Sequence, residues 1–141
     1  MLQQLIVHHY ALVDLLHLDF SRNMTAISGE TGAGKSILLG ALGLTLGDRA
    51  ESGCVRQGAE RADIHAVFDL THLPQVKDYL CAKHLVAAED SDTCILRRII
   101  NQDGLSRGYI NGKPGHITAL KFIGKQLINI HGQHEHQHLL G

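Results

Sequence analysis

The feature that most constrains this chain is a complete phosphate-binding loop, GETGAGKS, at residues 29–36. Four residues separate Gly29 from Gly34, and this spacing lets successive backbone N–H groups turn inward toward phosphate oxygens. Lys35 can then place its ammonium group on the β- and γ-phosphates, while the Ser36 hydroxyl can coordinate Mg²⁺. The helix that begins here adds its positive dipole end. The motif therefore predicts a bound nucleoside triphosphate.

The neighbouring segments favour this interpretation over a glycine-rich surface turn. Residues 24–28, MTAIS, form a short and mostly apolar run after a polar turn at 21–23, as expected for a buried strand. Residues 37–46 are apolar nearly all round, which suits a helix buried against a sheet and ending at Gly47. Strand, loop and helix thus follow one another in the order that a phosphate loop requires.

Composition limits the class of protein. The 141 residues suffice for one domain with a real core, and 44% hydrophobic with 19% charged residues excludes a disordered tail. Cys54, Cys81 and Cys94 are odd in number and widely spaced, so no disulfide framework is expected. We see no signal peptide or membrane-spanning run and expect a cytoplasmic protein without membrane contact. The net charge of −1 gives no argument for nucleic-acid binding.

The rest of the chain shows strand and turn patterns. The first twenty residues alternate partly between apolar and polar, which fits two strands joined by a turn. Asp-Gly between two β-rich runs predicts a hairpin. In chain order we expect a loop at 47–53, a strand at 61–70, a helix at 75–84 started by Pro74, hairpin strands at 94–100 and 106–110 around a turn at 103–104, a tight turn at 111–112, a helix near 117–123 and a strand at 126–131.

Hydrolysis of a nucleotide needs more than the loop: a carboxylate for Mg²⁺ and a group that activates water. Asp69 ends the apolar run 64–69 and is the internal candidate for the carboxylate, although an ordinary antiparallel strand is the favoured explanation. Gln133 follows an apolar run at a place where many ATPases have an amide that contacts Mg²⁺ and the attacking water. A surface loop residue is the alternative.

A cluster of histidines could be mistaken for a metal site. The cluster has no cysteines at zinc-like spacing, so solvated or capping side chains are favoured for its four members, His131, His134, His136 and His138.

Taken together, four segments resemble the bacterial RecN family, which belongs to the SMC-like branch of the ABC ATPases. These segments are the opening strands through Phe20, ISGETGAGKSILLGALGLTLGDRA at 27–50 with VRQGA at 55–59, LRRIINQDGLSRGYINGKP at 96–114, and LINIHGQHEHQ at 127–137. They occur in the family's order and spacing and span essentially the whole chain.

The resemblance implies an α/β P-loop NTPase fold, as the amino-terminal lobe of an ABC/SMC-like ATPase head with a mixed or antiparallel β-subdomain around the strand, loop and helix. Residues 1–141 would form one domain, apparently truncated before the family's coiled coil, because no signature segment, Walker B strand or heptad region is present. The resemblance also implies a role in DNA double-strand break repair and recombination in a bacterial, nucleoid-associated setting. ATP would join two heads as a homodimer, DNA would be a partner, and the carboxyl-terminal half of the head would complete each site.

The resemblance also assigns roles by position. Lys35 and Gln133 would serve catalysis, and Ser36 and Gln133 would hold Mg²⁺. Arg56 could reach phosphate or DNA across a head dimer, with a surface salt bridge as the alternative, and Tyr10 is a guess for adenine contact. ATP would be held by Gly29, Glu30, Thr31, Gly32, Ala33, Gly34, Lys35, Ser36 and Ile37, the last of which stands where many ABC proteins have threonine.

Two other functions stay open at this point. A small self-contained P-loop kinase or GTPase could use Asp69 for Mg²⁺. A folded interaction module with a vestigial loop would not be an enzyme at all.

Overall fold

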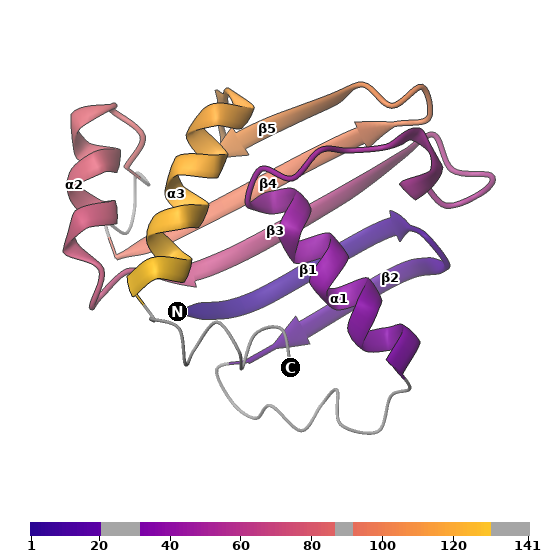
Figure 1. The fold of residues 1–141 in the computed structure, drawn as a ribbon, viewed down its shortest axis with the longest axis horizontal. Helices are drawn as coiled ribbons and strands as arrows, with labels where there is room; N and C mark the ends of the chain where they lie inside the picture. The colour runs from indigo at the N-terminus through magenta and orange to yellow at the C-terminus, as the bar shows by residue number, and fades with distance from the viewer. Residues whose placement is uncertain (21–31, 87–91, 131–141) are drawn as a thin grey trace.

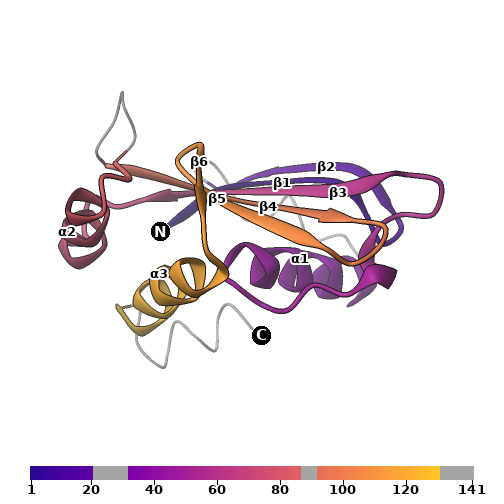
Figure 2. The same ribbon diagram turned by 90° about the horizontal axis from the view of Figure 1, so that it is seen from above.

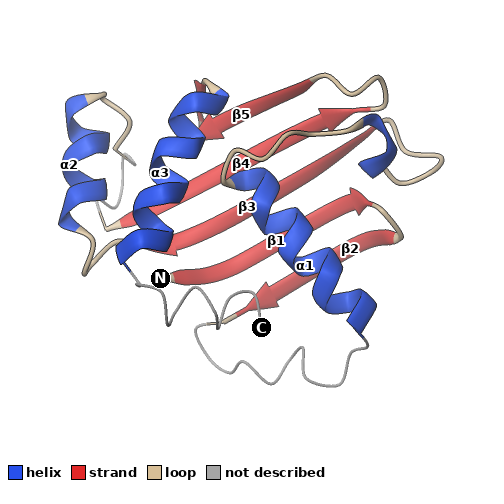
Figure 3. Ribbon diagram, viewed as in Figure 1, coloured by secondary structure: helices blue, strands red, loops and turns tan. Residues whose placement is uncertain are grey.

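A six-stranded antiparallel sheet forms the scaffold of the molecule (Figures 1 and 3). The computed structural model describes residues 1–20, 32–86 and 92–130. The strands lie in the order β2-β1-β3-β4-β5-β6, and each neighbouring pair is antiparallel. Their bounds are β1 Leu2–Tyr10, β2 Val13–Asp19, β3 Arg61–Asp69, β4 Thr93–Asn101, β5 Ser106–Ile110 and β6 Lys113–Gly115.

Three helices and one short 3-10 turn complete the described part of the chain. They are α1 (Gly32–Thr45), η2 (Ser52–Cys54), α2 (Pro74–Ala82) and α3 (Ile117–Ile130). Seen edge-on, α1 and α3 lie against the same face of the sheet, and α2 lies at one end (Figure 2). None of these helices has the length and apolar character that crossing a bilayer requires.

The alternating pattern of β3 and β4 explains which face is covered. Every second residue of both strands is buried and the residues between them are half-buried or exposed. Because side chains alternate across a strand, the buried set points toward α1 and α3. The core residues on this face include Ala62, Ile64, Ala66, Phe68, Cys94, Leu96 and Ile100.

Helix α1 is buried against this face, as its apolar sequence predicts. Ala41, Leu42 and Leu44 belong to the core. A Cβ at Gly40 would come within 2.5 Å of the Tyr10 hydroxyl oxygen, so a larger residue there would require the Tyr10 side chain to move. After Thr45 the chain turns away through Gly47, whose φ of 101° is open to glycine and rarely to other residues.

Most of the predicted elements are confirmed. The two amino-terminal strands, the strand at 61–70, the helix beginning at Pro74 and the hairpin of 94–110 appear with small shifts in their ends. Asn111 and Gly112 have φ values of 50° and 84°, and they form the two-residue turn between β5 and β6. The three-residue strand β6 was not predicted, because Lys113-Pro114-Gly115 carries no β-forming pattern.

The predicted strand at 126–131 is wrong for residues 126–130, which continue helix α3. Leu127 and its neighbours look β-rich in isolation, but Leu120, Ile123 and Leu127 are buried at spacings of three and four, which is one face of a helix. Residue 131 and the predicted strand at 24–28 lie outside the described residues.

Candidate nucleotide-binding site

The second half of the phosphate loop opens helix α1. The helix begins at Gly32, so that Lys35 and Ser36 stand among its first five residues. Ser36 is exposed and Ile37 is half-buried. Gly29, Glu30 and Thr31 lie outside the part of the chain that the structure describes.

The start of α1 is suited to an anion. The first N–H groups of a helix have no partner within the helix, and the aligned peptide dipoles place partial positive charge there. The first turn of α1 contains no acidic side chain that would compete with a phosphate for this end. The start of α1 can therefore receive phosphate oxygens, and the exposed residue Ser36 carries a hydroxyl of the kind that coordinates Mg²⁺.

The other end of α1 is held by a buried arginine of the sheet. Arg98 is 2% exposed, and its Nη1 donates to the carbonyl oxygens of Leu44 and Asp48, each at 2.7 Å. Its Nε and Nη2 donate to Ser106 Oγ at 3.2 and 2.9 Å. Burial lowers the pKa of the Arg98 guanidinium, and the nearby Asp48 charge opposes that shift. One guanidinium thus joins β4, β5 and the end of the phosphate-loop helix.

Helix α3 packs closely against the same end of α1. A Cβ at Gly124 would come within 2.9 Å of the Leu46 carbonyl oxygen, and one at Gly47 within 2.8 Å of the Lys121 backbone nitrogen. These glycines allow the two segments to approach backbone to backbone. The chain leaves α3 at Ile130, three residues before Gln133.

Several predicted site residues lie beyond α3. Gln133 and the cluster of His131, His134, His136 and His138 fall outside the described residues, so their geometry stays a prediction. Within the described ranges no group of three or more histidine, cysteine or acidic side chains could hold a metal ion.

Asp69, the rival candidate for a metal ligand, ends β3 in a local turn. Its Oδ1 accepts hydrogen bonds from Thr71 N at 3.2 Å and from Thr71 Oγ1 at 2.6 Å. These bonds lower the pKa of Asp69. The end of β3 pairs with the start of β1, whereas the far end of β1, at Tyr10, contacts α1. A strand of that length spans roughly 25 Å, and the end of β3 lies at the opposite side of the sheet from the start of α1 (Figure 1).

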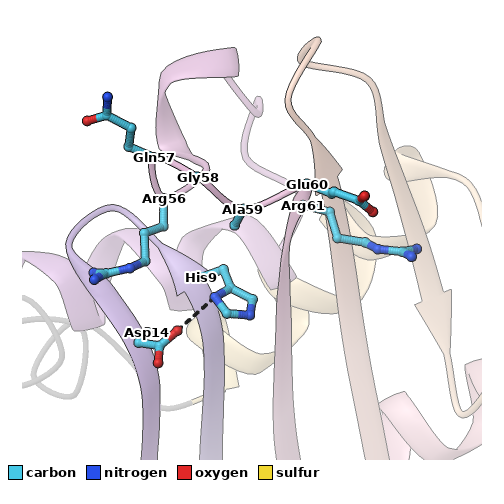
Figure 4. Close-up of a pocket in the computed structure, with 8 residues that line it drawn as sticks. All are labelled: His9, Asp14, Arg56, Gln57, Gly58, Ala59, Glu60 and Arg61. Carbon is cyan, nitrogen blue, oxygen red and sulfur yellow. Dashed lines mark ion pairs between the residues drawn. The ribbon is translucent and has the colours of Figure 1, made fainter.

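Arg56 lines a hollow of about 470 Å³ beside the β1–β2 turn (Figure 4). Its backbone N–H donates to the His9 carbonyl oxygen, and its Nη1 donates to the Leu12 carbonyl oxygen, so the residue ties this loop to the turn. His9 Nδ1 lies 3.0 Å from Asp14 Oδ1 on the wall of the same hollow. Among the described residues, the Arg56 guanidinium thus bonds to a backbone carbonyl, and both expectations for this residue, a contact across a head dimer and a surface salt bridge, stay predictions.

Tyr10, Cys54 and Cys94 take part in the packing of the core, whereas Cys81 is exposed. The Tyr10 side chain lies over Gly40 of α1, and partial burial raises its pKa. Cys54, Cys81 and Cys94 are free thiols, as expected. Burial raises the pKa of Cys94 to about 12, so this thiol is not poised for reaction.

The Arg98 contacts were missed at the sequence level. A signal for them exists, because Arg98 occupies an inward position in the alternation of β4, between Leu96 and Ile100. A charged residue at a core position of a strand indicates a buried partner. The sequence does not reveal that this partner is the end of α1, 54 positions away.

Known proteins share this sequence and fold. Residues 4–139 match the model of a family described as an AAA domain. DNA repair protein RecN of Vibrio cholerae and that of Xylella fastidiosa strain Temecula1 are each 46% identical over 99% of this chain and 25% of the relative. A solved structure from work on ATP-driven dimerisation and DNA-stimulated activation of SMC ATPases superposes with a TM-score of 0.68, at 20% identity, over 90% of this chain and 79% of the other.

The likeness in structure confirms the predicted fold, that of the P-loop ATPase heads of the SMC type. The chain spans about a quarter of the length of the curated relatives it matches. It belongs to the AAA domain family and is similar to the RecN proteins.

Proposed function

We propose that this chain is the nucleotide-binding part of an ATPase head that acts in DNA repair. The observation that carries the proposal is the loop GETGAGKS leading directly into α1 on an antiparallel sheet. The same arrangement of fold and motif, together with relatives named as DNA repair proteins, supports ATP with Mg²⁺ as the ligand.

The proposed roles follow the chemistry of each group. Backbone N–H groups of residues 29–37 cradle the phosphates, and Lys35 offsets the charge that develops on the transferred phosphoryl group. Ser36 and Gln133 would hold Mg²⁺, with Gln133 also placing the attacking water. Ile37 offers no hydroxyl, so the cradle has one side-chain contact fewer than in proteins with threonine there.

We further propose that the site is one part of a larger catalytic centre. In this scheme ATP joins two heads, a signature segment from one head completes the site of the other, and hydrolysis separates them. DNA and the other half of the head are then the partners of the complete protein, in the bacterial cytoplasm at the nucleoid. The support is the quarter-length match to RecN and the likeness to a head structure studied for ATP-driven dimerisation.

The split site predicts weak nucleotide binding and little turnover by the 141-residue chain alone. Phosphate release from Mg²⁺-ATP should stay near the background rate even when the nucleotide concentration is high enough to saturate the protein. The matched sample is a complete RecN protein under the same conditions. Turnover by this chain at the rate of the complete protein, abolished by Lys35→Ala, would show that the site is self-contained.

The rival function, a self-contained kinase or GTPase, requires Asp69 to hold Mg²⁺, whereas the split site does not. The Asp69 carboxylate is engaged by Thr71 at the far end of the sheet, so Asp69→Asn should leave Mg²⁺-dependent nucleotide affinity unchanged. Asp78→Asn, an exposed change on α2, is the matched control. Loss of Mg²⁺-dependent binding in Asp69→Asn alone would favour the rival. Failure of the unmodified chain to bind any ATP analogue would favour a non-catalytic interaction module.

A further inference from the structure

Arg98 forms hydrogen bonds to the carboxyl end of α1, whereas the phosphate loop lies at the amino end. We propose that Arg98 is a positioning residue for nucleotide binding. The inference rests on the proposed function and names a residue that would act on the nucleotide only through α1. Its guanidinium contacts the Leu44 and Asp48 carbonyl oxygens and Ser106 Oγ.

Directional contacts along α1 are the first reason. The apolar contacts of Ala41, Leu42 and Leu44 hold the helix against the sheet. Apolar contacts are non-directional, so they define the position of a helix along its own axis less sharply than hydrogen bonds do. A guanidinium is planar, with donors in fixed directions, and Arg98 aims two of them at backbone oxygens of α1 and the turn that follows it.

Ser106 gives the guanidinium its orientation. Its Oγ accepts from both Nε and Nη2 of Arg98, which fixes the plane of the group against β5. The contacts place the α1 end, β4 and β5 in a single hydrogen-bonded unit. Residues of two strands, β4 and β5, therefore determine where the end of the helix lies.

Charge is the second reason. The aligned peptides of α1 leave partial negative charge at its carboxyl end, where the Arg98 cation lies, and partial positive charge at its start. A guanidinium at one end and phosphates at the other complement the same dipole. With 14 residues α1 is about 20 Å long. A displacement at the Arg98 end is carried along this length to the loop, and a binding site must be held within about 0.5 Å of its productive geometry.

The test compares Arg98→Lys with Arg97→Lys by calorimetric titration with Mg²⁺-ATP. Arg97 is the adjacent residue of β4, makes an equally directional fork to Asp63, and faces away from α1. Both variants lose a guanidinium fork, but we expect only Arg98→Lys to weaken the affinity, by about tenfold. Each titration is run at a temperature at which circular dichroism shows the variant fully folded, so that lost stability does not enter the comparison.

A second pair of variants leaves the arginine in place. Ser106→Ala should weaken the affinity by about threefold, whereas Ser106→Thr retains the hydroxyl and should restore it. Wild-type affinity in both Arg98→Lys and Ser106→Ala would overturn the positioning role while leaving the proposed function intact. If Arg98→Lys does not fold, the contrast between Ser106→Ala and Ser106→Thr decides. Absence of binding by the unmodified chain would remove the proposed function and this inference together.

Discussion

Two adjacent arginines of β4 have different partners because their side chains point to opposite faces of the sheet. Arg98 points into the core and holds α1, whereas Arg97 points to the other face and forms a bidentate pair with Asp63, at 2.9 and 2.6 Å. His65 lies 3.1 Å from the same carboxylate. Partial burial acts to raise the pKa of Asp63, but the hydrogen bonds from Arg97 and His65 outweigh it and hold the pKa far below its ordinary range.

This pair predicts a pH-dependent contribution to stability. Because the pKa of Asp63 is lower in the folded chain than in the unfolded chain, the contribution is present above the unfolded value of about 3.9 and is lost as the pH falls below it. At pH 7, Asp63→Asn should lower the free energy of unfolding by about 1–2 kcal/mol. Thermal denaturation of both proteins between pH 7 and pH 3 should show the difference narrowing with acid. A difference that stays constant would contradict the assignment.

At the scale of elements, the approach of α1 and α3 depends on glycine. Gly47 and Gly58 both have positive φ, 101° and 91°, but only Gly47 is crowded. A Cβ at Gly47 would meet the Lys121 backbone, while a Cβ at Gly58 would meet nothing within 4 Å. The two positions therefore separate backbone strain from steric conflict.

Gly47→Ala should destabilise the chain more than Gly58→Ala. Alanine in the left-handed region costs about 1–2 kcal/mol at either position. Forcing the α1 and α3 segments apart adds about 1–3 kcal/mol at Gly47 alone. Urea denaturation of the two variants and the unmodified chain gives both free energies of unfolding. Equal losses would show that α3 yields without cost and that the close contact is unimportant.

The elements that sequence predicts well are those with local signals. Asn111-Gly112 and Pro74 act through their own backbone geometry, and β3 through strict alternation, so each could be located without the fold. The end of α3 could not, because residues 126–130 become helical as a continuation of the face begun at Leu120 and Ile123. The role of Arg98 depends on partners that are distant in the sequence. The sequence therefore shows only that a charged residue occupies an inward position in the alternation of β4.

At the scale of the whole molecule, the antiparallel sheet supports the phosphate-loop helix α1 and its neighbour α3. It places α1 and α3 on one face and leaves Asp69 at the far end of β3 (Figures 1 and 2). The phosphate-binding loop could be identified from the sequence because its glycine spacing is local and lets backbone N–H groups turn toward phosphate oxygens. The support of α1 by Arg98 and α3 could not, since contacts across the fold determine it.

The central claim is that residues 29–36 bind the phosphates of ATP, and calorimetric titration of the chain with Mg²⁺-ATP tests it directly. The unmodified chain and Lys125→Ala, an exposed change on α3, should bind with the same affinity. Lys35→Ala should bind at least about tenfold more weakly, since a charged hydrogen bond of about 1.5–3 kcal/mol is lost. Equal affinities in all three proteins, or no binding by the unmodified chain, would contradict the claim.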